Sequence, residues 1–434
     1  MGRLLRVLAI ATFLETLFVP AAGAFTYLVN PQGTGDFPTL EAALLAVQNG
    51  DIIELADGTY QRSFPESFDF LGKAITVRSQ SGVPENCLIH FESYACDQSG
   101  FIFQSGETGF STLEDISISS GWGHNVCDYA EDACHGGAGV VVANGSSPKL
   151  VNVLVFDTPL GVRICDSAPQ LLECRFIGNG LGVHAVGRST PFAVSSCIFE
   201  ENEIAVFCEG GLGTITGSVL TKCATSGTSV SFTRVAMVLR ENSQVDMDSC
   251  LVQENAGGVT VLESQHTMHN CIISGNAGTG SQEAGVFVGP GSDVTIERST
   301  IAGNRMVNAG GVEARSTVRI DRSVIWGNCK FGGSEHEVYA APGSAVTFEC
   351  SLVDSNGVGG SGLISWVGTN IFADPLFILP EGCEFAPTSF GDYCLSKNSP
   401  GRNVPGCGTL GAIFDPCLIS VESMSWGKIK ALYR

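Results

Sequence analysis

The chain has 434 residues, of which 44% are hydrophobic and 15% are charged, so it can bury a large core and is not disordered by composition. Its formal net charge of -21 at pH 7 repels nucleic-acid phosphates, which argues against a nucleic-acid-binding protein. A polyanionic ligand would need a local basic groove or bridging calcium to overcome the same field.

The first 24 residues have the pattern of a signal peptide. Arg3 and Arg6 precede an apolar run over 7–19, and the small residues 22–24 come directly before Phe25. The run is too short for a comfortable membrane span, and no later segment is longer and as apolar. We therefore expect cleavage after Ala24, no integral membrane span in the mature chain, and a secreted, cell-surface or periplasmic location.

Residues 25–99 are expected to form an N-terminal cap and the first strands. Within "GTGDFPTLEAALLAVQNGDIIELADGTY", Leu40, Ala43, Leu44 and Val47 recur at helical spacing, and Asn49-Gly50 ends the helix. The stretch "DIIEL" then predicts a strand. Almost no helical pattern follows in the rest of the chain, so this helix needs a special role.

A repeat of just over twenty residues occupies 100–369. Each copy has a short strand, often opening in Gly-Val, and later a piece similar to C-x-I-x-x-N. The slot filled by asparagine is taken by Gly121, Asp157 and Cys223 in weaker copies, which gives ten turns; the remaining copies end at Asn179, Asn202, Asn255, Asn276, Asn304, Asn328 and Asn356. Stacked asparagines can hydrogen-bond along a coil, although asparagine also simply tolerates a bend.

Alternation with a period of two predicts which residues face the core. In "GVRIC", Val162 and Ile164 point one way and Arg163 the other. If turns stack about 4.8 Å apart, like residues lie above one another. One predicted core column contains Leu154, Phe176, Phe199, Leu220, Val252, Ile273, Ile301, Ile325 and Val353.

The 17 cysteines fall into two groups. Close pairs in loop-like stretches are plausible bridges: Cys87–Cys96, Cys127–Cys134, Cys383–Cys394 and Cys407–Cys417. Cysteines two positions before the core column alternate with serine, and we interpret them as buried small side chains; this column is Cys174, Cys197, Ser218, Cys250, Cys271, Ser299 and Ser323.

The repeat, with its asparagines and the stretches "AGGV" at 256–259 and "NAGGV" at 308–312, resembles the all-β, right-handed parallel β-helix of the pectate-lyase-like superfamily. It also resembles repeats of bacterial polymorphic outer-membrane proteins. The opening stretch is similar to the N-terminal element of such proteins, where one helix covers the exposed end of the coil.

The C-terminal part is also similar to secreted bacterial β-helix proteins. Residues 370–417 resemble their closing segment, and 418–434 resemble a tail or linker. The resemblance therefore implies an N-terminal capping helix, a β-helix of about ten turns and a closing segment.

Enzymes of this fold usually work on the outer face of one sheet. The outward residues that follow the opening of each strand are Ile102, Val141, Arg163, His184, Phe207, Val238, Thr260, Phe287, Glu313 and Tyr339. Two groups in this column are candidate substrate-binding residues, one formed by Arg163, His184 and Phe207 and the other by Glu313, Arg315 and Tyr339. An aromatic plate beside a charged hydrogen-bonding group suits a sugar ring, and an ordinary solvated face is the alternative.

The sequence does not identify catalytic residues. Glycoside hydrolases need two nearby carboxylates, and Glu209, Glu263 and Glu313 lie more than one turn apart. A pectate-lyase-like mechanism would use Ca²⁺, with Arg163 or Arg315 as base, but no acidic cluster is placed beside either. The insertion at 121–137 holds His124, Asp128, Glu131, Asp132 and His135, which suit a metal, although a disulfide-closed loop is the simpler interpretation.

Three functions stay open. The first is an exported protein that binds extracellular carbohydrate or a cell-surface partner through its lateral face. The second is a divergent polysaccharide lyase or glycoside hydrolase, and the third is a structural or adhesive surface protein.

Overall fold

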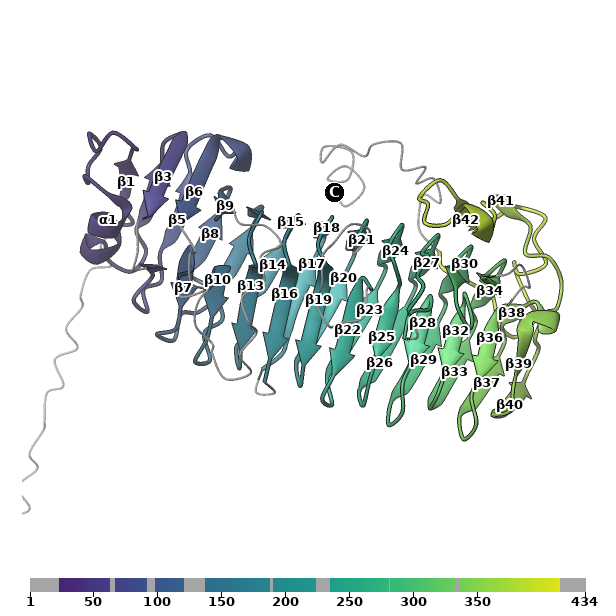
Figure 1. Cartoon of the computed structure of the whole chain (residues 1–434). Coiled ribbons are helices and arrows are strands. Elements are labelled where there is room, and N and C mark those ends of the chain that lie inside the picture. The colour runs from purple at the N-terminus through teal and green to yellow at the C-terminus, as the bar shows by residue number, and fades with distance from the viewer. Residues whose placement is uncertain are drawn as a thin grey trace, which may run out of the picture.

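The computed structural model describes residues 23–62, 67–91, 98–120, 137–187, 190–223, 235–280, 282–331 and 336–413. Three parallel β-sheets, here called A, B and C, are wound into one long coil (Figure 1). Each turn adds one strand to each sheet in that order, and every strand pairs with its equivalents one turn away.

Sheet A contains fourteen strands in the described residues: β1 (Thr26–Val29), β2 (Ile52–Leu55), β5 (Thr76–Ser79), β8 (Thr112–Glu114), β11 (Lys149–Val151), β14 (Gln170–Leu172), β17 (Phe192–Ser195), β20 (Leu212–Thr216), β23 (Gln244–Asp248), β26 (Gln265–His269), β29 (Asp293–Glu297), β33 (Thr317–Asp321), β37 (Ala345–Glu349) and β40 (Leu363–Val367).

Sheet B has twelve strands in the same part of the chain: β3 (Gly58–Arg62), β6 (Cys87–Phe91), β9 (Ser117–Ser119), β12 (Leu154–Phe156), β15 (Arg175–Ile177), β18 (Ile198–Glu200), β21 (Val219–Thr221), β24 (Leu251–Gln253), β27 (Ile272–Ser274), β30 (Thr300–Ala302), β34 (Val324–Trp326) and β38 (Leu352–Val353).

Sheet C also has twelve described strands: β4 (Phe68–Asp69), β7 (Phe101–Phe103), β10 (Ala138–Val142), β13 (Leu160–Cys165), β16 (Leu181–Val186), β19 (Ile204–Glu209), β22 (Met237–Arg240), β25 (Val259–Val261), β28 (Val286–Val288), β32 (Val312–Ala314), β36 (Val338–Ala340) and β39 (Val358–Gly360).

The remaining elements are short. The strand pair β31 (Arg305–Met306) and β35 (Cys329–Lys330) is parallel, and β41 (Phe377–Leu379) and β42 (Asp392–Leu395) are antiparallel. The helical elements are α1 (Leu40–Ala46) and three single 3₁₀ turns, η1 (Pro84–Asn86), η2 (Ser355–Gly357) and η3 (Cys383–Phe385).

The predicted parallel β-helix is confirmed, but it has about twelve turns rather than ten. The two additional turns contain β3 and β6, which lie N-terminal to residue 100 and lack the C-x-I-x-x-N signature. The predicted helix is also confirmed. Thr39 accepts a hydrogen bond from the Ala42 amide as its N-cap, and Leu40, Ala43 and Leu44 join the main core at the end of the coil (Figure 1).

The core column of sheet B follows the prediction with one correction. Phe176, Phe199 and Leu220 lie on consecutive turns, and the Phe176 and Phe199 rings stack with centroids 4.8 Å apart. In the turn before them, Val155 rather than Leu154 pairs with Phe176. That turn lacks both the cysteine and the asparagine that fix the register elsewhere.

Sheet A turns into sheet B at one residue with left-handed backbone conformation. Glu173, Ser196 and Asn270 are examples, with φ of 55°, 55° and 53°. A single left-handed residue produces a sharp corner at a modest conformational cost. The small side chain that follows accepts the backbone N–H of the preceding turn, as Ser218 does from Cys197 at 3.1 Å. The cysteines of this column are buried free thiols, as predicted: Cys174, Cys197, Cys250 and Cys271.

Buried asparagines stack at the bend between sheets B and C. Asn276 Nδ2 donates to Val252 O at 3.0 Å and to Asn304 Oδ1 at 2.8 Å, and its Oδ1 accepts from the amide and Nδ2 of Asn255. The predicted ladder is therefore present, with Cys223 occupying one slot. Thr158, not Asp157, occupies the slot before Asn179.

The ladder ends one turn earlier than predicted. Asn328 Nδ2 donates to Glu337 Oε2 at 2.7 Å, so a buried glutamate terminates the stack. Asn356 is exposed and instead donates to Asp354.

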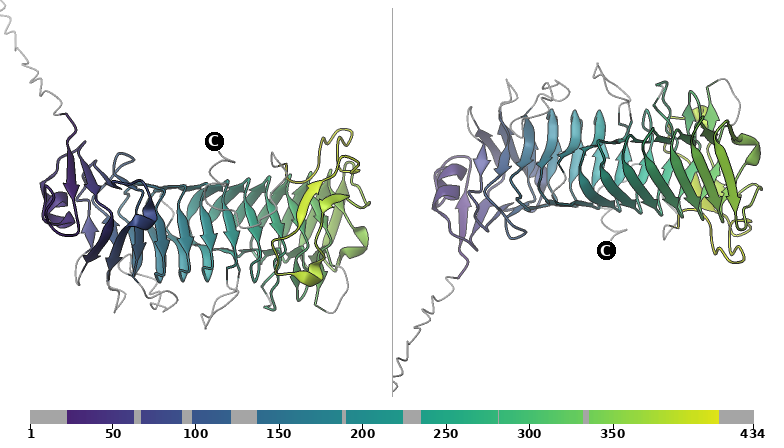
Figure 2. Two further views of the ribbon diagram at one scale, coloured as in Figure 1. Left: turned by 90° about the horizontal axis from the view of Figure 1, so that it is seen from above. Right: turned by 90° about the horizontal axis from the view of Figure 1, so that it is seen from below.

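Residues 377–413 fold back over the outer face of sheet B, toward the N-terminal end of the coil (Figure 2). Their path is marked by three bonds: Gly411 N to Arg322 O, Ala412 N to Thr300 Oγ1, and Ile413 N to Asn270 Oδ1. Phe377, Tyr393, Val404 and Leu410 pack there with residues of β30, β34 and β38.

Two disulfides attach this segment to the coil, and they differ from the predicted pairs. Cys383 is bonded to Cys329, not Cys394, and Cys407 is bonded to Cys350, not Cys417. Cys87 is a buried free thiol, and the other members of the predicted pairs, Cys96, Cys127 and Cys134, lie outside the described residues.

Candidate functional site

The outer face of sheet C carries the predicted column of residues in unbroken register. Arg163 of β13 pairs with His184 of β16, which pairs with Phe207 of β19. Further along, Phe287 of β28 pairs with Glu313 of β32, which pairs with Tyr339 of β36. The coil thus brings both candidate groups onto one face, about 4.8 Å apart from turn to turn.

The first group forms a network of charged and polar side chains. Arg163 Nη1 lies 2.6 Å from His184 Nδ1, and His184 Nε2 lies 2.7 Å from Glu209 Oε2. Arg240 Nε donates to Glu209 Oε1 at 2.8 Å, and its guanidinium lies over the Phe207 ring at 4.9 Å. Sequence reasoning missed Arg240; the signal was its register opposite Glu209 on the next turn.

The electrostatics of this network favour neutral His184 and ionised Glu209. Burial, reinforced by Arg163 and Arg240, lowers the pKa of His184 to about 4 in spite of Glu209. Burial alone would raise the pKa of Glu209, but hydrogen bonds from His184 and Arg240 lower it to about 2. Neutral His184 therefore accepts from Arg163 at Nδ1 and donates from Nε2 to Glu209.

The first group of the column is buried rather than exposed to solvent. Arg163, His184 and Phe207 are only 4%, 1% and 1% exposed. Phe207 belongs to a second hydrophobic cluster on the outer face of sheet C, separate from the main core; its other buried members are Ala138, Val141, Ala143, Leu160, Cys165, Leu181, Ile204, Val235 and Val238. Arg163 and His184 therefore do not form a solvated face, whereas the Arg240 side chain of the same network is 29% exposed.

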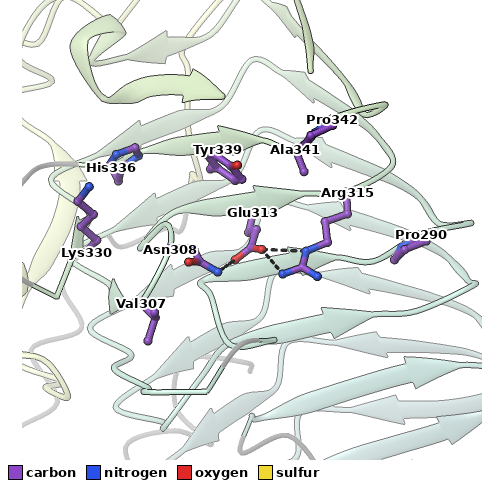
Figure 3. Close-up of a pocket in the computed structure, with 10 residues that line it drawn as sticks. All are labelled: Pro290, Val307, Asn308, Glu313, Arg315, Lys330, His336, Tyr339, Ala341 and Pro342. Atoms are coloured by element: carbon purple, nitrogen blue, oxygen red, sulfur yellow. Dashed lines mark hydrogen bonds and ion pairs between the residues drawn. The ribbon is translucent and has the colours of Figure 1, made fainter. Parts of the chain in front are cut away.

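The second group lines a cavity of about 650 Å³ (Figure 3). Glu313, Arg315 and Tyr339 are joined there by further residues of the same and the preceding turn, which sequence reasoning missed: Pro290, Val307, Asn308, Lys330, His336, Ala341 and Pro342. Asn308, Lys330 and His336 lie between an asparagine bend and the next strand of sheet C.

Glu313 is held at the floor of this cavity. Its side chain is 1% exposed, and Oε1 accepts from Arg315 Nε at 2.9 Å and from Arg315 Nη2 at 2.8 Å. Oε2 accepts from Asn308 Nδ2 at 3.1 Å (Figure 3). The Arg315 side chain is 39% exposed and lies over the Phe287 ring at 5.0 Å, so it is fixed from two sides while it still reaches the cavity.

The chain is similar to a known family model in sequence and to several solved β-helix proteins in structure. The family model described as "Right handed beta helix region" matches residues 192–325 and 235–378. The catalytic domain of a GH87 α-1,3-glucanase in complex with tetrasaccharides has a TM-score of 0.51 at 11% identity, covering 77% of this chain and 66% of that one. The protein is a right-handed parallel β-helix.

Two further solved structures are similar to this β-helix protein. The GH87 α-1,3-glucanase catalytic domain in complex with nigerose gives a TM-score of 0.50 at 10% identity, with 77% of this chain and 66% of that chain covered. Pectate lyase Pel9A gives 0.42 at 16% identity, covering 90% and 96%. The chain thus spans about two thirds of the length of the glucanase catalytic domains. No curated protein sequence matches the chain.

Neither a metal cluster nor a membrane helix occurs in the described residues. They contain no group of three or more His, Cys, Asp or Glu side chains able to hold a metal ion. The proposed ligands at 124–135 lie outside these residues, so that hypothesis and the possible use of Ca²⁺ stay predictions. Within the described part of the β-helix protein, no helix is long and apolar enough to cross a membrane.

Proposed function

We propose that the protein binds extracellular carbohydrate at the cavity around Glu313, Arg315 and Tyr339. The observation that carries this proposal is the cavity itself, which combines a tyrosine ring with a fixed carboxylate–guanidinium pair on a rigid sheet. Sugar rings present apolar C–H faces and hydroxyl edges, which an aromatic ring and paired hydrogen-bonding groups complement. The GH87 α-1,3-glucanase catalytic domains support the proposal because they share the fold and are in complex with tetrasaccharides or nigerose.

Binding without hydrolysis fits the lining residues best. Glycoside hydrolysis by the usual two-carboxylate route needs a second carboxyl group within about 5–9.5 Å. Glu313 is the one carboxylate among the ten lining residues, and Arg315 and Asn308 already occupy both of its oxygens. The lyase or glycosidase and the purely structural roles therefore remain secondary hypotheses. Export through residues 1–24, and hence an extracellular or cell-surface location, belongs to the same proposal.

Glycan-array binding of the mature chain, combined with an assay for released product, tests this function. We expect binding without product, and we expect Tyr339→Ala to weaken it about 3–10-fold because the ring contact is lost. Phe110→Ala is the matched control, since Phe110 is 80% exposed and does not line the cavity. Equal weakening by both substitutions, or glycan binding that ignores Tyr339, would count against the cavity; steady product release would favour the enzyme.

A further inference from the structure

The cavity has a charge balance opposite to that of the whole chain. The protein carries a net charge of -21, yet Arg315, Lys330 and His336 all line this one cavity. Glu313 is the only carboxylate among the described residues that line the cavity, and it is buried and already paired with Arg315. The polar groups left to face a ligand are therefore mainly cationic or hydrogen-bond donors.

Among the described residues, two of these groups have side-chain nitrogen atoms without a partner. Lys330 makes no ion pair or side-chain hydrogen bond among the described residues, whereas Lys222 on the same protein is paired with Glu200. The Nδ1 atom of His336 is buried and has no hydrogen-bond partner. The His336 backbone N–H donates to Asn328 O at 3.1 Å, which fixes the residue at the cavity edge.

The unpaired groups lie close enough to influence each other. Burial lowers the pKa of His336, and the positive charge of Lys330 lowers it further. Figure 3 shows both side chains at the same end of the cavity, with Tyr339 beside them and Arg315 opposite. A ligand anion placed between Lys330 and His336 would pair with the Lys330 ammonium and accept a hydrogen bond from the buried Nδ1–H of neutral His336.

We propose that the saccharide bound in this cavity carries an anionic substituent, a carboxylate or a sulfate, which Lys330 and His336 contact directly rather than through a bridging metal ion. This inference rests on the proposed carbohydrate binding at the same cavity. It explains how a strongly acidic protein accepts an anionic ligand, because the local cationic groups offset the repulsion of the remaining surface. Direct contact agrees with the lack of an acidic metal cluster among the described residues.

Two pairs of soluble probes with and without charge test the inference by calorimetry. One pair is oligogalacturonate and its methyl ester, and the other is dextran sulfate and dextran, each measured in EDTA and in excess calcium. We expect the charged member of at least one pair to bind ten-fold or more tightly than its neutral partner. The preference should persist in EDTA and decrease with added salt; which pair shows it distinguishes a carboxylate from a sulfate.

A lysine substitution shows whether the cavity supplies the charge. We expect Lys330→Ala to reduce the preference for the charged probe about ten-fold or more and Lys330→Arg to retain most of it, since a charge-assisted hydrogen bond is lost only in the first. Lys397→Ala is the control, because Lys397 is exposed and lies outside the cavity. Equal effects of Lys330→Ala and Lys397→Ala would overturn the inference.

The remaining outcomes separate this inference from the function on which it rests. Equal binding of charged and neutral probes would overturn the anionic ligand and leave carbohydrate binding standing. Binding that disappears in EDTA would show that a bridging cation holds the ligand, and it would overturn direct contact. If all four probes and a wider glycan array fail to bind, the proposed function itself falls.

Discussion

The buried side chain of Glu337 occupies the place in the ladder that asparagine side chains fill in most other turns. Its carboxylate accepts from Gly327 N at 2.7 Å and from Asn328 Nδ2 at 2.7 Å. Burial nevertheless raises its pKa to about 8, although these hydrogen bonds lower it. The pKa in the unfolded chain is about 4.5, so the unfolded state releases the proton at lower pH than the folded state.

The stability of the protein should therefore depend on pH through Glu337. Between about pH 4.5 and 8, rising pH favours the unfolded chain, and the contribution of Glu337 to unfolding free energy falls by about 3–5 kcal/mol. Glu337→Gln does not titrate, so we expect its stability deficit relative to the parent to shrink as pH rises. Urea unfolding at pH 5 and pH 9 measures the change. A deficit that stays constant over this range would contradict the assignment.

Residue identity alone did not reveal which outward side chains reach solvent. Arg163 and His184 were placed correctly on the outer face of sheet C, yet both are buried beside an apolar cluster. That cluster combines residues as far apart in sequence as Ala138 and Val238, and no local pattern announces it. Lys330 and His336 were missed for a related reason, because Lys330 lies in the two-residue strand β35 and His336 precedes β36, so neither belongs to the alternating strands of sheet C.

Among the structural elements, the asparagine ladder joins successive turns through side chains as well as backbone. Asn276 connects three levels of the coil, since it binds Asn255, Val252 and Asn304. Replacing it removes the acceptor of two buried donors on Asn255 and the side-chain donor to Val252 O. Unsatisfied buried groups of this kind are costly.

We expect Asn276→Ala to lower the free energy of unfolding by about 2–4 kcal/mol. Asn356→Ala is a matched control, because Asn356 ends the same sequence motif but is exposed and outside the ladder; its effect should stay within about 0.5 kcal/mol. Chemical denaturation followed by circular dichroism gives both values. Similar losses in the two variants would mean that the motif, rather than the buried contacts, determines stability.

The repeated elements were predictable because the motif in each turn indicates how that turn pairs with its neighbours. Period-two alternation after Gly-Val located sheet C residue by residue, and the Cys/Ser and Asn positions located sheet B. The errors occurred where these marks are absent: Val155 replaced Leu154, and the turns of β3 and β6 were not counted. At the C-terminal end of the ladder the motif gave a wrong prediction. Asn356 matches the motif, but the side chain of Glu337 is the one that contacts Asn328.

At the scale of the whole molecule, the two disulfides close loops that the sequence did not indicate. Cys329–Cys383 and Cys350–Cys407 join residues 54 and 57 positions apart. Spacing favoured short-range pairs, and only the return of residues 377–413 over sheet B brings the distant partners together. Cross-links over loops of this length restrict the unfolded chain strongly.

Removing either disulfide should therefore destabilise the protein by about 4 kcal/mol in the chain-entropy estimate. The variant Cys350→Ser/Cys407→Ser tests one of them in thermal and urea unfolding. Cys271→Ser is the control, because Cys271 is a free thiol in a column where serine already occurs, and we expect it to cost much less. If the double variant unfolds at the parent's midpoint, the cross-link adds nothing to stability.

The two anchor points also govern how the molecule would respond to mechanical load. Cys350 lies at the corner between sheets A and B, whereas Cys329 follows the corner between sheets B and C. The disulfides therefore attach residues 377–413 at both edges of sheet B. Tension applied at Ile413 would be transmitted as shear across several coils at once. It would not unzip the final turn alone.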